Sequence, residues 1–246
     1  EMSIKNQSNL KSRINRGEQV IGVEIPHNLN KHEITSLVEN DKYDFLWIDT
    51  QHRPVDEPLV SKLCVVAAEV GVDVIFRIRH TQQTYLIGNH LDIGPSGIEV
   101  PQVETESTVQ EAIDYFYYPP FGQRSWGGIY RRAIDEIPDR HEYTKWWQEY
   151  GVLWMQMESV EGVTNVKKLA KKGVDCMSFG PNDLMYSIES HPNSPYKTVD
   201  DCIAHVISEL RDTGTAVCFR IRDQGLRQKY KDMGVTVILE HLEQKI

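Results

Sequence analysis

The chain lacks paired cysteines, long apolar runs and an excess of positive charge. Its cysteines are isolated in apolar segments without a CxxC pattern, at Cys64, Cys176, Cys202 and Cys218. Isolated cysteines of this kind indicate buried thiols in a reducing cytosol rather than a disulfide framework. No apolar run approaches the roughly 20 residues that span a bilayer, and the opening residues show no signal-peptide pattern. We therefore expect a cytoplasmic protein that has no membrane partner.

The charge balance of the sequence is acidic. The chain carries 27 lysines and arginines against 36 aspartates and glutamates, for a net charge of −9. Because nothing would offset phosphate repulsion, this balance argues against nucleic acid as a partner. The 246 residues, of which 40% are hydrophobic and 26% charged, are typical of a globular protein and suffice for one large domain.

Short apolar segments alternate with amphipathic ones along the chain. The apolar segments predict strands at residues 19–26, 43–50, 72–79, 97–101, 152–159, 174–181, 215–223 and 235–241. The amphipathic segments predict helices at 31–40, 58–70, 84–90, 105–117, 145–150, 162–172, 198–212 and 225–233. This alternation predicts a (β/α)8 TIM barrel that forms a single domain over residues 1–246. A doubly wound open sheet is the alternative, although the first βα turn lacks a GxGxxG motif.

Two carboxylates stand at the ends of neighbouring predicted strands. Glu158 ends the run WMQME, and Asp183 ends the run FGPND. In an α/β barrel the carboxyl ends of the strands carry the chemistry. Two acids there would share a divalent cation, and oxygen-only ligation favours Mg²⁺ or Mn²⁺. Each acid would alternatively cap the following helix or pair with a lysine.

Polar residues also occur at the ends of other predicted strands. His52 follows Asp49 by three residues, so the carboxylate would fix one ring nitrogen and leave the other as an acid or base. Alternatively, His52 is a surface histidine. Arg77 alternates with apolar neighbours in its strand, and there it would meet either an anionic substrate or a barrel acid. Gln156 shares a strand face with Glu158, and its amide would hold a ligand or join a hydrogen-bond network.

Residues 118–142 form a long excursion rich in Gly, Pro, Arg and aromatic residues. Structureless segments of this length are usually functional. We expect Trp126, beside Gly127 and Gly128, to fold over a site as a lid, or else to form a surface or subunit contact.

Together these positions resemble the HpcH/HpaI family of class II pyruvate aldolases, over nearly the whole chain. The motifs that carry the resemblance are IDTQHRP, VIFR, LDIGPSGIEVPQVET, YPPFGQR, MQMES and FGPNDL. The resemblance implies a (β/α)8 barrel that uses a divalent cation, with Mg²⁺ or Mn²⁺ favoured and Co²⁺ or Zn²⁺ as alternatives. It also implies a homo-oligomer, either a hexamer or a dimer.

The resemblance implies a role for each matching residue. Glu158 and Asp183 correspond to the metal ligands, and His52, oriented by Asp49, to the catalytic acid/base. Arg77 and Gln156 correspond to the residues that hold the keto oxygen and carboxylate of pyruvate. The backbone at Asn182 and Asp183 corresponds to a cradle for that carboxylate.

The implied reaction is reversible cleavage of a 4-hydroxy-2-oxo acid to pyruvate and an aldehyde, through a pyruvate enolate bound to the metal. The partners are then a small 2-oxo acid and an aldehyde. Decarboxylation of oxaloacetate, cleavage of a malyl- or citramalyl-CoA-type thioester, and an inactive ligand-binding barrel remain as alternatives.

The sequence departs from the family pattern at Gln51, Arg53 and Arg220. The added positive charge suggests an acidic second substrate or a different leaving fragment. Little chain follows residue 241, which leaves little room for the terminal helix that family members exchange between subunits.

Overall fold

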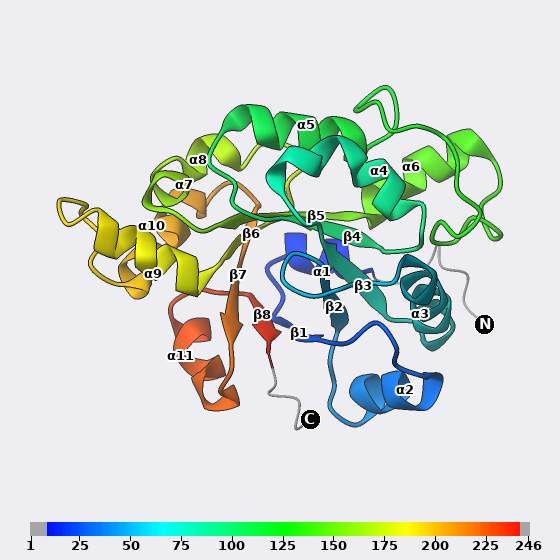
Figure 1. Cartoon of the computed structure of the whole chain (residues 1–246), viewed down its shortest axis with the longest axis horizontal. Coiled ribbons are helices and arrows are strands. Elements are labelled where there is room, and N and C mark those ends of the chain that lie inside the picture. The colour runs from blue at the N-terminus through cyan, green and yellow to red at the C-terminus, as the bar shows by residue number, and fades with distance from the viewer. Residues whose placement is uncertain (1–8, 242–246) are drawn as a thin grey trace.

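Eight parallel strands form a closed barrel in the computed structural model, which describes residues 9–241 (Figure 1). The strands are β1 (Val20–Glu24), β2 (Phe45–Asp49), β3 (Asp73–Arg77), β4 (Gly97–Val100), β5 (Val152–Met157), β6 (Cys176–Phe179), β7 (Ala216–Ile221) and β8 (Val237–Glu240). Each strand pairs with the next along the chain, and β8 closes the barrel against β1. The predicted (β/α)8 barrel is confirmed. Residues 1–8 and 242–246, which include both limits of the predicted domain and the chain that follows the last predicted strand, lie outside the described residues.

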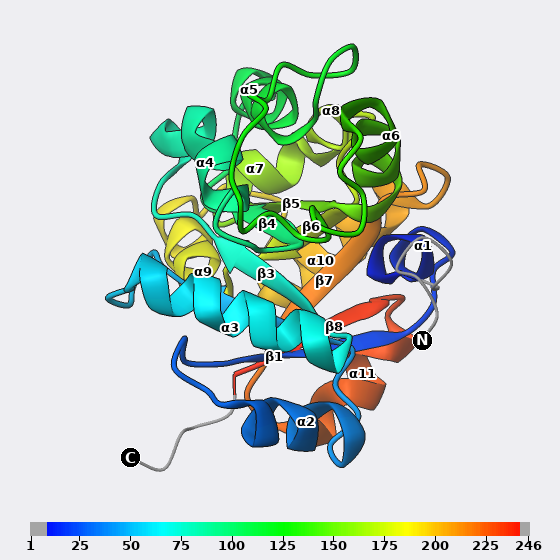
Figure 2. The same cartoon turned by 90° about the vertical axis from the view of Figure 1, so that its right-hand side faces the viewer.

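Helices surround the barrel between successive strands (Figures 1 and 2). They are α1 (Leu10–Asn15), α2 (Lys31–Glu39), α3 (Glu57–Val70), α4 (Ile87–Leu91), α5 (Glu106–Phe116), α6 (Arg140–Tyr150), α7 (Val160–Thr164), α8 (Val166–Leu169), α9 (Pro181–Ser190), α10 (Val199–Leu210) and α11 (Arg227–Asp232), with 3₁₀ turns at Thr81–Leu86 and Gln224–Leu226. The α9 helix was not predicted, because its opening Gly180-Pro181 was read as the end of a strand. The predicted helix at 162–172 is divided at Asn165 into α7 and α8.

Alternate residues of each strand point into the barrel. In β2, Phe45 and Trp47 belong to the interior cluster, whereas Leu46 and Ile48 pack in the layer between strands and helices. This is the period of two that a strand imposes on its side chains. The interior is tightly filled, because a Cβ atom at Gly22 would lie 2.1 Å from the Phe45 ring. Glycine at position 22 is therefore required by packing.

The amino end of the barrel is closed by α1 and a buried ion pair. Leu10 and Ile14 of α1 join the interior cluster. Lys11 donates hydrogen bonds to the Tyr117 hydroxyl at 2.9 Å, to the Gly151 carbonyl at 2.8 Å and to Asp175 at 3.2 Å. Burial raises the pKa of Asp175, although the charge of Lys11 acts in the opposite direction.

Within residues 9–241, no helix has both the length and the apolar character needed to cross a bilayer.

The Lys11–Asp175 pair yields a stability prediction. Substituting Lys11→Met leaves the Asp175 carboxylate buried without its cation, so we expect the free energy of unfolding to fall by about 3–5 kcal/mol. Lys31→Met is the matched control, because Lys31 and Glu69 form an exposed pair at 2.8 Å. Removing an exposed pair costs under about 1 kcal/mol. Urea denaturation measures both variants, and equal losses would contradict a structural role for the buried pair.

Candidate active site

A cavity of about 520 Å³ opens at the carboxyl ends of the strands. Every site residue predicted from the sequence lines it: Asp49, His52, Arg77, Gln156, Glu158, Asn182 and Asp183. Further lining comes from strand-end residues that the sequence did not single out, among them Glu24, Arg222 and His241. The structure thus brings the predicted residues together, at the end of the barrel where α/β enzymes place their chemistry.

Glu158 is a buried carboxylate that forms no ion pair with a lysine, arginine or histidine among the described residues. It accepts hydrogen bonds from the backbone N–H of Gln102 at 2.9 Å and from the Gln156 amide at 3.0 Å. Burial raises the pKa of Glu158 to about 7, although Arg77 acts to lower it, and the charge of Asp183 adds to the increase. A carboxyl in this position gains from a nearby cation.

Neither acid acts as a helix cap. Ser159 caps α7 with its side chain, and Gly180 is the N-cap residue of α9. Asp183 lies exposed in the first turn of α9, where its charge is near enough to raise the pKa of Glu158. The ion pairs of the described residues include no lysine bonded to either acid. The alternatives of a helix cap or a lysine pair are therefore not supported.

The donor set fits a cation that prefers oxygen ligands. Among residues 9–241, no three His, Cys, Asp or Glu side chains form a metal-ligating cluster, so a cation here would rest on two carboxylates from the protein. Mg²⁺ sites commonly have this form, with water and substrate oxygens completing the shell. Gly180 leaves the space beside this carboxylate open. A Cβ atom at position 180 would lie 2.2 Å from Glu158 Oε1, so any other residue there would crowd the proposed ligand oxygen.

Arg77 links Asp49, at the end of β2, to Gln156 of β5. Its guanidinium pairs with Asp49 at 2.8 Å and donates to Gln156 Oε1 at 3.2 Å. The Gln156 amide in turn donates to Glu158. Arg77 therefore pairs with a barrel acid, which was one of the two alternatives predicted from the sequence. It also lines the cavity. The chain of contacts fixes which way the Gln156 amide points.

The predicted contact between Asp49 and the His52 ring does not form. Asp49 Oδ1 accepts from the backbone N–H groups of Gln51 at 2.9 Å and His52 at 3.4 Å, and from Arg77. The carboxylate therefore holds the turn and the arginine rather than the imidazole, because a tight turn brings backbone N–H groups closer than the side chain. His52 is exposed at the cavity mouth.

Arg220 does not add unpaired charge to the site, as was expected from the sequence. Its guanidinium pairs with the fully buried Glu99, which also accepts from Ser178 and, at 2.8 Å, from the Trp47 indole. Although burial acts to raise it, the charges of Arg220 and Arg77 hold the pKa of Glu99 below its usual value. The Trp47 ring lies 4.9 Å from the Arg77 guanidinium and 5.1 Å from that of Arg220. The charge of Arg220 is therefore compensated within the protein, and Arg220 gives no support to the prediction of an acidic second substrate.

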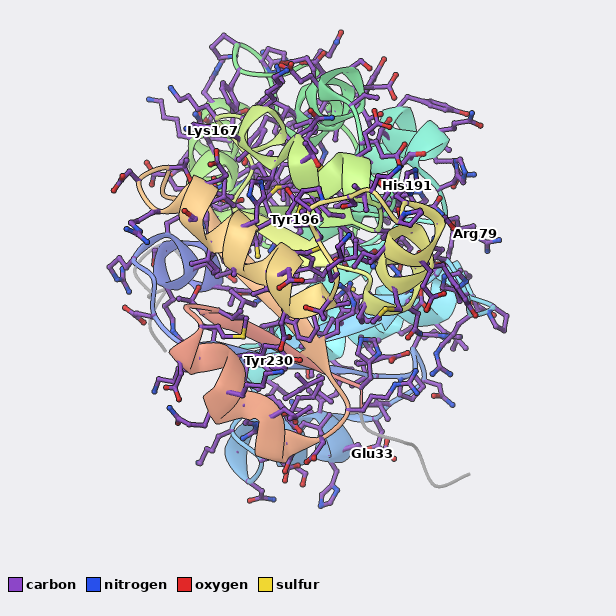
Figure 3. The ribbon with its side chains drawn as sticks, turned by 90° about the vertical axis from the view of Figure 1, so that its left-hand side faces the viewer. Glu33, Arg79, Lys167, His191, Tyr196 and Tyr230 are labelled. Atoms are coloured by element: carbon purple, nitrogen blue, oxygen red, sulfur yellow. The ribbon has the colours of Figure 1, made fainter. Side chains whose placement is uncertain are left out.

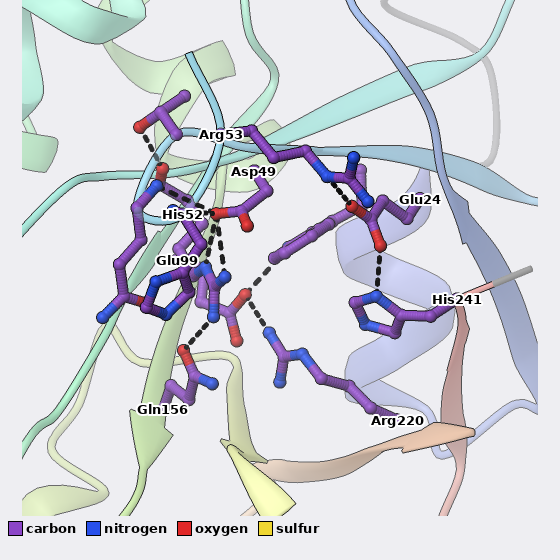
Figure 4. A network of polar contacts seen from close by, with 12 residues as sticks. Glu24, Asp49, His52, Arg53, Glu99, Gln156, Arg220 and His241 are labelled. Atoms are coloured by element: carbon purple, nitrogen blue, oxygen red, sulfur yellow. Dashed lines mark hydrogen bonds and ion pairs between the residues drawn. The ribbon is translucent and has the colours of Figure 1, made fainter. Parts of the chain in front are cut away.

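Arg53 is paired as well. Its Nε donates to Glu24 Oε1 at 2.7 Å, and the other oxygen of Glu24 contacts His241 Nδ1 (Figure 4). Glu24, Glu99 and His241 were not among the site residues predicted from the sequence. Each is a polar residue in an apolar strand, at a position whose alternation points inward, and that signal would have identified them.

The long excursion lies away from the cavity. None of residues 118–142 lines the cavity, and Trp126 instead packs against Tyr118 at 5.6 Å, Tyr143 at 5.5 Å and Arg131 at 4.0 Å. This segment joins α5 to α6, and its Arg132 lies 3.9 Å from Asp73 at the first position of β3, which places it toward the amino end of the barrel. The lid prediction is wrong for that topological reason.

Several known proteins are similar to this chain in sequence or in fold. A hydroxypyruvate/pyruvate aldolase of Pseudomonas aeruginosa is 29% identical over 93% of this chain and 84% of its own length. A 2-keto-3-deoxy-L-rhamnonate aldolase of Salmonella paratyphi B is 27% identical over 93% of this chain and 84% of its own. The crystal structure of an HpcH/HpaI aldolase from Desulfitobacterium hafniense has the same fold, with a TM-score of 0.81, 24% identity and coverage of 96% of this chain and 90% of that one.

The HpcH/HpaI aldolase/citrate lyase family model matches residues 27–236, which include β2 to β7 but neither β1 nor β8. That span also contains every site residue predicted from the sequence. The chain therefore belongs to the HpcH/HpaI aldolase/citrate lyase family.

Proposed function

We propose that this protein is a metal-dependent class II aldolase that reversibly cleaves a 4-hydroxy-2-oxo acid to pyruvate and an aldehyde. The family and the aldolase names of the relatives support a carbon–carbon lyase. The observation that carries the proposal is the meeting of Glu158, Asp183 and the Arg77–Gln156 pair in one cavity. These are the groups needed to hold a 2-oxo acid and stabilise its enolate.

Glu158 and Asp183 would hold the divalent cation, with Mg²⁺ or Mn²⁺ favoured over Co²⁺ or Zn²⁺ by the oxygen donors. When bound, such a cation supplies a Lewis acid that stabilises negative charge on the substrate. The Gln156 amide and the Gln102 N–H hold the two oxygens of Glu158 in place.

Arg77 and the start of α9 would bind the 2-oxo acid. The Arg77 guanidinium lies on the cavity wall and is anchored by Asp49, so its positive charge is preorganised for the oxyanion that forms at the keto oxygen. The N–H groups of Asn182 and Asp183, in the first turn of α9, are oriented to receive the carboxylate.

His52 would transfer the proton of the C4 hydroxyl. It lines the cavity mouth, and the turn held by Asp49 sets its backbone position. An imidazole suits proton transfer near neutral pH. Asp49 would then be a positioning residue that acts through the backbone and through Arg77.

Schiff-base chemistry has no support here. Among the described residues that line the cavity, none is a lysine. Lys167 lies on the outer helical layer (Figure 3), where its side chain is 71% exposed and pairs with Glu209. A lysine on that layer points away from the strand ends, as expected from its helical segment.

Assembly and location remain proposals. A homo-oligomer is supported by exposed apolar side chains such as Val65 and Tyr130, which lie together in one surface groove. The four cysteines are free and buried, which supports a reducing, cytoplasmic setting.

Removal of the cation tests the metal site. We expect EDTA to abolish cleavage activity and Mg²⁺ or Mn²⁺ to restore it. Glu158→Gln or Asp183→Asn removes one ligand charge, so Mn²⁺ affinity measured by calorimetry should fall more than about tenfold. Glu189→Gln, an exposed acid at the far end of α9, is the control and should bind as the wild type does. Full activity after complete chelation would contradict the proposal.

Exchange of the pyruvate C3 protons tests enolate formation without knowledge of the aldehyde. In D₂O with Mg²⁺ or Mn²⁺, the wild type should remove the methyl signal of pyruvate from the proton NMR spectrum. Arg77→Met removes a donor to the developing oxyanion, so exchange should slow by about 10²–10³-fold. Arg79→Met is the control, since Arg79 follows the same strand but is exposed outside the cavity (Figure 3). A ligand-binding barrel without turnover would show no exchange.

A further inference from the structure

The cavity has a second polar wall that the proposed reaction does not use. Glu24 ends β1, and His241 directly follows β8. Both line the same cavity as Glu158 and Asp183. In Figure 4, His52 and His241 lie on opposite sides of the polar network. This wall is therefore available to a part of a substrate that Glu158, Asp183 and Arg77 do not hold.

Strand register brings Glu24 and His241 together. Val23 of β1 pairs with Glu240 of β8, so Glu24 and His241 each follow by one residue on neighbouring strands. The Nδ1 atom of His241 contacts one carboxylate oxygen of Glu24, and Arg53 donates to the other at 2.7 Å. Both oxygens of Glu24 are thereby engaged.

The charge of Glu24 fixes the imidazole tautomer. Although burial acts to raise it, the hydrogen bond and charge of His241 and the charge of Arg53 lower the pKa of Glu24 to about 2. An ionised carboxylate only accepts hydrogen bonds, so Nδ1 of His241 carries a proton. The ring nitrogen that does not contact Glu24 is therefore Nε2.

Nε2 of His241 is buried and has no hydrogen-bond partner among residues 9–241. The nearest aromatic contact is the Trp47 ring, at 5.4 Å between centroids and 69° between planes. Trp47 gives its own N–H to Glu99, so it does not serve Nε2. Buried polar atoms without partners are uncommon in native proteins, and one that belongs to a residue lining a cavity points to a ligand.

We propose that His241, oriented by Glu24, binds a hydroxyl group on the aldehyde-derived part of the substrate and makes the enzyme selective for hydroxylated aldehydes. A hydroxyl both donates and accepts, so it satisfies Nε2 of the imidazole as well as of the imidazolium. Because Arg53 already pairs with Glu24, that arginine is not free to hold a carboxylate or phosphate of a substrate beside the ring. This assignment rests on the proposed aldolase function and names the electrophile class for that site.

The test measures aldol addition of pyruvate to glycolaldehyde and to acetaldehyde, with Mn²⁺ present. We expect the wild type to prefer glycolaldehyde in kcat/KM. A site built to bind a hydroxyl rejects the analogue that lacks it, because its own polar group is then left unpaired.

Two substitutions of His241 distinguish the role of Nε2 from that of Nδ1. His241→Asn keeps a donor to Glu24 but removes Nε2, so the glycolaldehyde-to-acetaldehyde ratio of kcat/KM should fall by at least about tenfold. His241→Gln places an amide near Nε2 and should retain part of the ratio. The ratio is independent of the amount of active enzyme, so either variant is informative if the other fails to fold. His191→Ala, at the exposed end of α9 (Figure 3), is the control and should keep the wild-type ratio.

An unchanged ratio in His241→Asn would overturn the inference while leaving the aldolase proposal intact. Equal ratios in the Asn and Gln variants, both well below the wild type, would also overturn the assignment to Nε2 and give the effect to the Glu24 contact. The absence of pyruvate C3 exchange in the wild type would instead remove the proposed function, and this inference with it.

Discussion

The inward alternation of the eight strands is the constraint on which the site depends. Within β2, residues 45 and 47 fill the barrel with aromatic rings, and the next inward position is Asp49. The same phase takes β5 from Trp154 to Gln156 and then to Glu158. Because the barrel is closed, these inward positions converge. The packed apolar interior thus becomes the floor of a polar cavity, and a shift of one residue in any strand would turn its polar residue outward.

The distribution of charge in the cavity indicates where a cation would bind. The charges near the strand ends are mostly neutralised in pairs: Arg77 with Asp49, Arg220 with Glu99, and Arg53 with Glu24. Glu158 is the exception, since it has only amide donors and its pKa rises to about 7. A buried carboxylate is costly unless it meets positive charge. The need for a cation is therefore local to Glu158 and its neighbour Asp183.

The sequence predicts the strands and their polar ends well, because a period of two and the break at each turn are local signals. It predicts less well what those side chains contact. The pairs Arg220–Glu99 and Glu24–His241 join residues distant in sequence, and only strand register brings them together. The Asp49–His52 prediction failed because the backbone of the turn competes for the carboxylate. The Trp126 prediction failed because the segment between α5 and α6 packs toward the amino end of the barrel, through contacts such as Arg132–Asp73 that join residues distant in sequence.

The central claim is that Glu158 and Asp183 grip one divalent cation beside a bound 2-oxo acid. The most direct measurement is an anomalous difference map from crystals grown with Mn²⁺ and pyruvate. The account predicts a single strong peak within bonding distance of one oxygen from each carboxylate, with pyruvate oxygens completing the shell and Arg77 close to the keto oxygen. A peak elsewhere in the cavity, or carboxylates that turn apart while pyruvate binds without a cation, would contradict it.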